Sequence, residues 1–346
     1  MVLWCMAALI SAFAPTSHAF KREYKMQVTV GPNYYWGRGA AKFAELVKLK
    51  TAGRIKIKPY YGSSLLRGAQ LKSSQLVSMG VIDCALDSTI NISPVIPECN
   101  VFSLPFFINT YDNLDRLENG KTGSLIFSAM KKKGLKPLAW GENGFRQITC
   151  SKKAILSPAD LKGLTVRVVG SPIFIDIFRT MGADPVNMNW GDAITAFQQG
   201  VVDAQENPVG ILLSAQIWQY HRRVTFWNYM ADPLIFYWSL REWRTFSPGI
   251  QKSIMAAAVE AGRYEKALVR AGLDNGESLL ILEKEFNEKD VIPDPTAYMK
   301  GKNMRVIELD SDKRAQFKRA VAPVYEKWEK KIGKEVVKSA KQDMAK

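Results

Sequence analysis

The chain has 346 residues, of which 47% are hydrophobic, and 48 Lys and Arg against 33 Asp and Glu give a formal net charge of +15 at pH 7. This size is enough for two domains with a hydrophobic core in each. The positive charge favours anionic partners, but zinc-finger spacing, an RNP-like segment and a glycine-rich phosphate loop are absent from the sequence, so we expect no nucleic acid among them.

The first nineteen residues have the pattern of a secretory signal peptide. An apolar run at 2–10 is followed by Ser17-His18-Ala19, which fits a cleavage site with small residues. The run is too short to span a bilayer, and no later stretch of about 18 uninterrupted apolar residues occurs. We therefore expect an exported protein without a membrane span. Because no Lys or Arg lies near Met1, we also expect translation to start further upstream.

Strands and helices alternate along the rest of the chain, which predicts an α/β protein with parallel sheets. Apolar, β-branched runs predict strands, and apolar residues at helical spacing predict helices. The predicted strands are 24–30, 54–60, 81–86, 136–140, 145–150, 164–169, 185–188, 201–206 and 232–242. The predicted helices begin after Gly31-Pro32, at 68–79, at about 110, at 122–133, at 172–181, at 190–199 with Asn189 as the cap, after Asn207, and at 248.

Two predicted helices near the C-terminus are unusual. Ser247-Pro248 opens a helix that continues to about 289, and at ~1.5 Å per residue it would reach roughly 60 Å and brace two lobes. Residues 313–346 hold eleven basic and four acidic residues on an amphipathic helix, whose apolar face is Phe317, Val321, Tyr325 and Trp328. We expect a monomer, and leave open whether this helix packs on its own lobe or on a second copy.

Cysteine and histidine usage predicts no reactive centre. Once the leader is removed, Cys84, Cys99 and Cys150 are an odd set in apolar surroundings, which favours buried free thiols and leaves a Cys84–Cys99 bridge open. Without a C-x-x-C pair, a structural zinc site is not expected. His221 is the only mature histidine, and Arg222-Arg223 beside it indicates a basic helix surface rather than a general base. We expect no catalytic residue, no metal and no cofactor.

Arg167 is the most informative residue, because it interrupts an apolar strand just before Gly170-Ser171-Pro172. A guanidinium in a buried strand is several kcal/mol out of place unless it is paired. Ser171 and Pro172 are typical of a helix start, so Arg167 lies near the carboxyl end of its strand, where open α/β sheets bind ligands. Asn207 is predicted on the same rim. The partner of Arg167 is either an anionic ligand or an Asp or Glu of the same domain.

Five stretches then resemble the solute-binding proteins of TRAP transporters, the DctP family. They are GVID at 80–83, LPF at 104–106, GFRQIT at 144–149, SPADLKGLTVRV at 157–168 and AFQQGVVDAQENP at 196–208. The resemblance covers nearly the whole mature chain. It implies two α/β lobes like those of periplasmic binding proteins, joined by strands and a long helix, with a cleft between them that closes on a small organic acid.

The resemblance also implies site residues. Arg167 would pair with the solute carboxylate, Arg146 would be a second cationic contact and Asn207 a polar contact. A planar guanidinium suits this role because it meets a carboxylate with two parallel hydrogen bonds. Weaker candidates belong either to the cleft wall or to the core. The aromatic ones are Tyr34, Tyr35, Trp36, Phe174 and Trp190. Asp87, Ser88 and Asn91 would contact a hydroxyl or amine of the solute. Glu206 is expected to anchor Arg146 or the hinge.

The sequence therefore predicts a periplasmic binding protein that delivers an organic acid to a TRAP-type membrane permease. One lobe would hold 20–144 and about 232–272, and the other 145–231 and about 273–346, with hinges at 142–144 and 228–233. Aromatic residues near the cleft and the lack of a third arginine favour a monocarboxylate, such as a keto or aromatic acid. A sensing module for a membrane receptor and a hydrolase acting on an anionic substrate remain alternatives.

Overall fold

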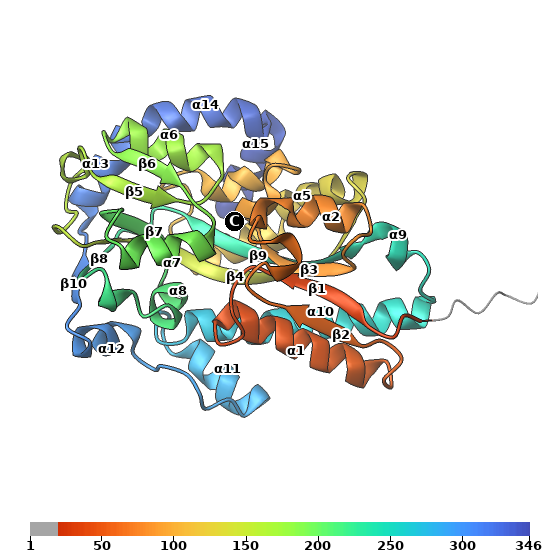
Figure 1. The fold of residues 1–346 in the computed structure, drawn as a ribbon. Coiled ribbons are helices and arrows are strands. Elements are labelled where there is room, and N and C mark those ends of the chain that lie inside the picture. The colour runs from red at the N-terminus through yellow and green to blue at the C-terminus, as the bar shows by residue number, and fades with distance from the viewer. Residues whose placement is uncertain (1–19) are drawn as a thin grey trace, which may run out of the picture.

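A computed structural model describes residues 20–346 and confirms the α/β class (Figure 1). The predicted signal peptide at 1–19 lies outside the described residues. One sheet runs through the molecule in the order β2-β1-β3-β9-β4-β7-β5-β6, and β8 joins β10 to β4. The strands are β1 (Tyr24–Val28), β2 (Ile57–Tyr60), β3 (Cys84–Ser88), β4 (Leu135–Cys150), β5 (Thr165–Val168), β6 (Asp184–Asn187), β7 (Ala204–Pro208), β8 (Arg223–Phe226), β9 (Ala231–Ser239) and β10 (Arg305–Glu308).

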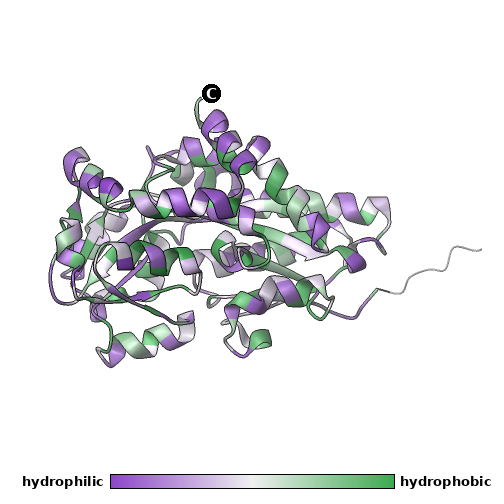
Figure 2. Cartoon of the chain, turned by 90° about the horizontal axis from the view of Figure 1, so that it is seen from above, coloured by the Kyte–Doolittle hydropathy of each residue, from purple (hydrophilic) through white to green (hydrophobic). Residues whose placement is uncertain are grey.

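Helices cover the sheet, and most carry hydrophilic and hydrophobic residues in alternation, as helices with one buried face do (Figure 2). The α-helices are α1 (Tyr35–Lys50), α2 (Ser73–Ser78), α3 (Thr89–Ile92), α4 (Tyr111–Asn119), α5 (Lys121–Lys132), α6 (Pro172–Thr180), α7 (Trp190–Gln198), α8 (Val209–Ser214), α9 (Leu240–Trp243), α10 (Pro248–Arg270), α11 (Glu277–Phe286), α12 (Pro295–Gly301), α13 (Ser311–Ala320), α14 (Ala322–Ile332) and α15 (Lys334–Met344). Short 3-10 segments are η1 (Ser64–Leu66), η2 (Gln70–Lys72), η3 (Pro97–Ser103), η4 (Pro158–Leu161) and η5 (Ile217–Gln219).

The sheet divides into two lobes that meet along β4. Lobe I contains β1, β2, β3, β9 and the first part of β4, while lobe II contains the end of β4 with β5 to β8 and β10. The sequence predicted two strands separated by a hinge at 142–144, whereas β4 is one strand of 16 residues. Its pairing with β9 shifts between Glu142 and Gly144, where Gly144 has a φ of +101°. A glycine tolerates this backbone without strain, so the break in the pattern marks an irregularity inside a continuous strand.

The predicted 60 Å helix is wrong in its length. The Ser247 side chain accepts a hydrogen bond from the Ile250 amide as expected, but α10 ends at Arg270 and α11 begins only at Glu277. At ~1.5 Å per residue α10 is about 34 Å long. Gly272 has a φ of +70°, and a Cβ there would lie 2.3 Å from the Pro293 carbonyl oxygen. The chain turns at this point because its backbone packs against 293–295.

The single helix predicted over 313–346 is also wrong, because this segment forms the three helices α13, α14 and α15. Pro323 lies at the start of α14, and Gly333 has a φ of +103° between α14 and α15. The apolar face is nevertheless buried, with Phe317, Val321 and Trp328 in the main core cluster. The Trp328 indole donates to Asp176 of α6 at 2.7 Å, and Asp343 accepts from Thr122 of α5 at 2.8 Å. The C-terminal helices thus pack on helices of both lobes.

Buried polar and sulfur-bearing residues complete the core. Cys84, Cys99 and Cys150 are buried and free, so the Cys84–Cys99 bridge is not formed. His221 is buried rather than on a basic surface: its Nδ1 lies 2.8 Å from the Thr149 hydroxyl, and its ring packs on Phe197. Burial lowers the pKa of His221 from 6.5 to about 4, so the imidazole is neutral at physiological pH.

Candidate functional site

A small cavity lies between the lobes and contains most of the predicted site residues. Its volume is about 30 Å³ in this closed arrangement of the lobes. Its walls come from both lobes and are Thr29, Val30, Trp36, Gln70, Ser88, Ile90, Asn91, Asn143, Arg146, Arg167, Val169, Trp190, Asn207, Ile211 and Asp232. The cavity therefore sits at the carboxyl ends of β1, β3, β5 and β7, on the rim where open sheets bind ligands.

Arg167 is almost completely buried, with 2% of its surface exposed, yet it has no carboxylate within ion-pair distance among residues 20–346. One terminal nitrogen donates to the Met188 carbonyl at 2.7 Å, and the Nε has no hydrogen-bond partner in this part of the chain. The guanidinium lies 5.5 Å from the centre of the Trp190 ring. Burial lowers its pKa from 12.5 to about 10, so the group is still charged at neutral pH.

Arg146 is equally buried but fully paired. Its Nε donates to Glu206 at 2.5 Å, one terminal nitrogen donates to Asp232 at 2.7 Å, and the other donates to Glu206 and to the Asn207 side-chain oxygen at 3.0 Å. Burial alone would lower the pKa of Arg146, but the charges of Glu206 and Asp232 raise it above its usual value. The expectation that Glu206 anchors Arg146 is confirmed.

The two arginines therefore differ in what they offer the cavity. The charge of Arg146 is neutralised by two carboxylates that also hold it in place, whereas the charge of Arg167 is not compensated by an ion pair. The internal salt bridge that the sequence left open for Arg167 is absent among the described residues. An uncompensated guanidinium in a buried cavity favours an anion, because a carboxylate would satisfy its free N–H groups and its charge together.

Polar side chains from lobe I form another part of the cavity wall. The Ser88 hydroxyl donates to Asp232 at 2.5 Å, and the Asn143 amide donates to the other oxygen of the same carboxylate at 2.8 Å. The Asn91 amide donates to Asp87 at 2.8 Å and its oxygen accepts from Gln70. Asp87 lies behind this wall and does not line the cavity, and burial raises its pKa from 3.8 to about 7.

Two of the five aromatic residues predicted for the cleft wall line the cavity. The Trp36 indole donates to the Leu86 carbonyl at 3.0 Å. Trp36 and Trp190 both line the cavity. Tyr34 packs instead on the lobe I core, and Phe174 is fully buried with its ring 5.6 Å from the Arg146 guanidinium. Tyr35, also suggested, packs on the cluster around Leu268. Phe174 therefore packs against Arg146 in the core and does not reach the cavity.

Asn207 reaches the cavity from a strand rather than from a helix cap. It is part of β7, and α8 starts one residue later than predicted, with Pro208 at the cap position. Its side-chain oxygen accepts from Arg146 and its amide donates to Gln205 at 2.6 Å. The amide is thus oriented by neighbours on both sides.

Several residues of the cavity wall were not predicted from the sequence. Gln70 falls inside what resembled an ordinary helix, and Asn143 and Asp232 were noted only as hinge positions. These residues contact the cavity because segments far apart in sequence meet there: Asn143 and Asp232 are separated by 89 positions, and Gln70 and Trp190 by 120. Contacts between segments so far apart cannot be predicted from a local sequence pattern.

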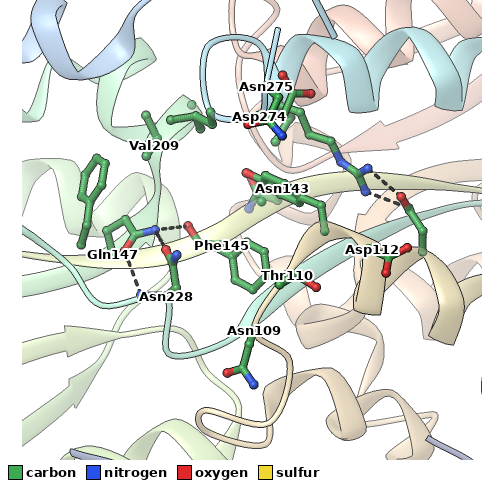
Figure 3. A pocket seen from close by; sticks show the side chains of 18 of the residues that line it. Asn109, Thr110, Asp112, Asn143, Phe145, Gln147, Val209, Asn228, Asp274 and Asn275 are labelled. Atoms are coloured by element: carbon green, nitrogen blue, oxygen red, sulfur yellow. Dashed lines mark hydrogen bonds and ion pairs between the residues drawn. The ribbon is translucent and has the colours of Figure 1, made fainter. Parts of the chain in front are cut away.

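A second, wider cavity of about 580 Å³ also borders β4 (Figure 3), and Asn143 lines both cavities. Gln147 and Asn228, which are hydrogen-bonded to each other, lie on its lobe II side, and Asp112 lies across from them (Figure 3). Among the described residues that line it, Arg270 is the one cation, and it is paired with Asp115 and Glu142. Because the remaining charged groups there are carboxylates, this cavity does not suit an anion.

The first cavity offers guanidinium, amide, hydroxyl and aromatic groups to a bound molecule. No Cys, His or Lys is among the residues that line it, and no cluster of three or more His, Cys, Asp and Glu with metal-site geometry occurs within 20–346. In the same range, none of the helices is both long enough and apolar enough to cross a membrane.

Comparison with known proteins agrees with this geometry. The family described as bacterial extracellular solute-binding protein, family 7 (DctP) matches residues 26–331. The 2,3-diketo-L-gulonate-binding periplasmic protein of Escherichia coli K12 is 31% identical over 230 residues, 66% of this chain and 70% of that protein.

Two crystal structures of TRAP periplasmic solute-binding proteins have the same fold. The protein from Ralstonia eutropha H16, with bound (S)-2-acetolactate, is 41% identical with a TM-score of 0.88, and the match covers 94% of this chain and 99% of that one. The protein from Polaromonas sp. JS666, bound to D-erythronate, is 29% identical with a TM-score of 0.81 over 92% and 98% of the two chains. The predicted two-lobed fold is thereby confirmed, and the chain belongs to the DctP family of TRAP periplasmic solute-binding proteins.

Proposed function

We propose that this protein captures a short monocarboxylate in the interlobe cavity, with Arg167 as the carboxylate clamp, and delivers it to a TRAP-type membrane permease. The uncompensated guanidinium of Arg167 carries this proposal. It is buried, and among residues 20–346 its Nε has no hydrogen-bond partner and its terminal nitrogens donate to the Met188 carbonyl alone. Two charge-assisted bonds of ~1.5–3 kcal/mol each to a carboxylate, together with burial of the solute, give sub-micromolar affinity.

The preference for one carboxylate follows from Arg146. A second carboxylate on the solute needs a second available cation, but Arg146 is held by Glu206 and Asp232. Binding a dicarboxylate would place its second charge beside these two buried carboxylates, which is unfavourable. Arg146 and Asn207 then act as a fixed polar wall beside the solute rather than as a second clamp.

The chemical class is narrowed by the lining of the cavity. Trp36, Val30 and Ile211 provide an apolar surface for a methyl group. Asn91, Ser88 and Asn143 provide amide and hydroxyl groups for a hydroxyl or keto oxygen. The Ralstonia protein of 41% identity binds a branched hydroxy-keto acid, which supports a 2-hydroxy or 2-keto acid of similar size.

Capture requires motion of the lobes, and we place it at 142–144 and 228–233. Export through the segment 1–19 and release into the periplasm complete the proposal. We assign residues 20–144 and about 232–272 to lobe I, and residues 145–231 and the segment after 273 to lobe II. The exception is α15, which packs on α4 and α5 of lobe I. Binding and release of the unchanged acid need no catalytic group.

A thermal-shift screen with the mature protein tests this proposal. We expect (S)-2-acetolactate or a 2-hydroxy or 2-keto acid of similar size to stabilise the protein by ~2.7 kcal/mol at 100 times its dissociation constant. Succinate serves as the dicarboxylate control and should give no shift at the same concentration. Stabilisation by succinate alone, or by none of the monocarboxylates, would overturn the assignment.

A further inference from the structure

The η2 segment of lobe I reaches across the cleft to lobe II. Gln70 is buried, and its side-chain oxygen accepts a hydrogen bond from the Trp190 backbone amide at 2.9 Å. Its side-chain nitrogen donates to Asn91 at 2.9 Å. Since Asn91 belongs to lobe I and Trp190 begins α7 of lobe II, this one side chain links the two lobes.

The helix α7 depends on this link for its cap. The first amides of a helix have no partner within the helix and are commonly satisfied by the residue before it. Asn189 occupies that position, as the sequence predicted, but its side chain makes no capping bond. The acceptor comes from Gln70 on the opposite lobe instead. Because the Trp190 ring lies over Arg167, Gln70 also fixes the aromatic surface beside the proposed carboxylate clamp.

The next residue, Leu71, rests on a glycine of lobe II. A Cβ placed on Gly170 would lie 2.5 Å from the Cδ1 of Leu71 and 3.2 Å from the side-chain nitrogen of Asn187. The φ of Gly170 is not in the left-handed region, so space rather than backbone conformation favours glycine here. The adjacent Ser171 hydroxyl lies 3.4 Å from the Ser93 hydroxyl of lobe I, so the lobes meet along this whole edge of the cavity.

We propose that Gln70 and Leu71 form a latch that holds lobe II over the occupied cavity and thereby sets the rate at which the solute leaves. The inference rests on the proposed capture of a carboxylate. Gln70 lines the cavity, but neither Leu71 nor Gly170 does. Leu71 and Gly170 are therefore positioning residues, which act on the solute only through closure of the lobes.

Stopped-flow dissociation measures this effect in the mature chain, with (S)-2-acetolactate as the probe and the fluorescence of Trp36 and Trp190 as the signal. Gln70→Met removes both hydrogen bonds at similar size, and we expect dissociation to accelerate about 3- to 10-fold. Gly170→Ala forces Leu71 out of its rotamer, with an expected acceleration of the same order. The association rate should stay within about twofold for both, because the open form is unaltered.

A coupled pair and a matched control separate the latch from a general loss of structure. Leu71→Ala removes the obstacle, so Gly170→Ala combined with Leu71→Ala should dissociate no faster than Leu71→Ala alone. Gly191→Ala is the control, since it lies in α7 of lobe II with nothing within 4 Å of an added Cβ. Its dissociation rate should equal that of the wild type.

The outcomes also separate this inference from the proposed function. Wild-type dissociation rates in both Gln70→Met and Gly170→Ala would overturn the latch, as would additive effects in the combined variant. A lower melting temperature of the empty Gly170→Ala protein with unchanged dissociation would assign the glycine to folding and overturn the latch at that position. Failure of the wild type to bind acetolactate or any related acid would instead overturn the proposed function.

Discussion

Replacing Arg167 by Met should weaken binding of the acid strongly and stabilise the empty protein. The side chain is 2% exposed, has one hydrogen bond to a carbonyl and makes no ion pair with any carboxylate of residues 20–346. The lowering of its pKa from 12.5 to about 10 corresponds to a burial cost of about 3 kcal/mol. At pH 7 the group is charged in both the folded and the unfolded state, so this cost is fully present. Met has a similar length and no charge to bury.

The stability change has a measurable size. For a chain of this length the unfolding entropy is about 0.7 kcal/mol per kelvin, so relief of ~3 kcal/mol raises the melting temperature of the empty protein by about 4 °C. Loss of two charge-assisted hydrogen bonds removes ~3–6 kcal/mol of binding free energy, which weakens the affinity by about 10²- to 10⁴-fold. Differential scanning calorimetry of the empty protein and titration calorimetry with the acid measure the two effects separately.

Arg167→Lys provides the matched control. It retains the charge but not the planar fork, so we expect an affinity between those of the wild type and Arg167→Met, without the gain in stability. The reasoning is refuted if Arg167→Met binds the acid as tightly as the wild type. It is also refuted if the empty variant melts several degrees lower, because Arg167 would then have a structural partner.

Three further predictions concern buried charges, and melting curves test each. Arg146→Met should lower the stability by ~3–5 kcal/mol, since it leaves Glu206 and Asp232 buried without their cation; an unchanged melting temperature would contradict the ion-pair network. Asp87→Asn should stabilise the protein at pH 8 by up to about 4 kcal/mol, because burial raises the pKa of Asp87 to about 7 and the buried carboxylate is unfavourable at higher pH. This gain should shrink towards pH 5, where the carboxyl group of the folded wild type is protonated. His221→Gln should lose less stability than the wild type between pH 7 and pH 5. The folded pKa of His221, about 4, lies below the unfolded value of 6.5, so the wild type loses about 2 kcal/mol over this range as its unfolded state takes up the proton.

Most of the fold follows from local patterns, and the errors have identifiable causes. Apolar β-branched runs and helix-start pairs such as Ser171-Pro172 were sufficient for β5 and α6. The predicted helix over 248–289 failed because apolar spacing persists through the turn at Gly272. What forces the turn is the close approach of the Pro293 carbonyl, a contact between segments 21 residues apart in sequence. Periodicity records which face of a helix is buried, but not where the backbone of another segment blocks its path.

The candidate site was predictable to the extent that its residues interrupt a local pattern. Arg167 stands out because a charge is unusual in a buried strand, and the rim position follows from the helix that starts after it. Gln70 does not stand out, because a glutamine in a short helical segment is ordinary. Its role follows only from Trp190, 120 positions away, whose amide lacks a local acceptor. Polar wall residues of this kind need the assembled structure.

The contrast between the two arginines explains why sequence could place both at the site but not distinguish them. Arg146 owes its neutralised state to Glu206 and Asp232, 60 and 86 positions away, and the sequence around Arg167 is no less apolar. Once folded, the paired arginine stabilises the scaffold, while the unpaired one destabilises it. A solute carboxylate that enters the cavity would remove that destabilisation, since it supplies a negative charge and hydrogen-bond acceptors for the Arg167 N–H groups. Under the proposed function, the absence of an internal partner should strengthen binding of the acid, because no ion pair has to break before the solute binds.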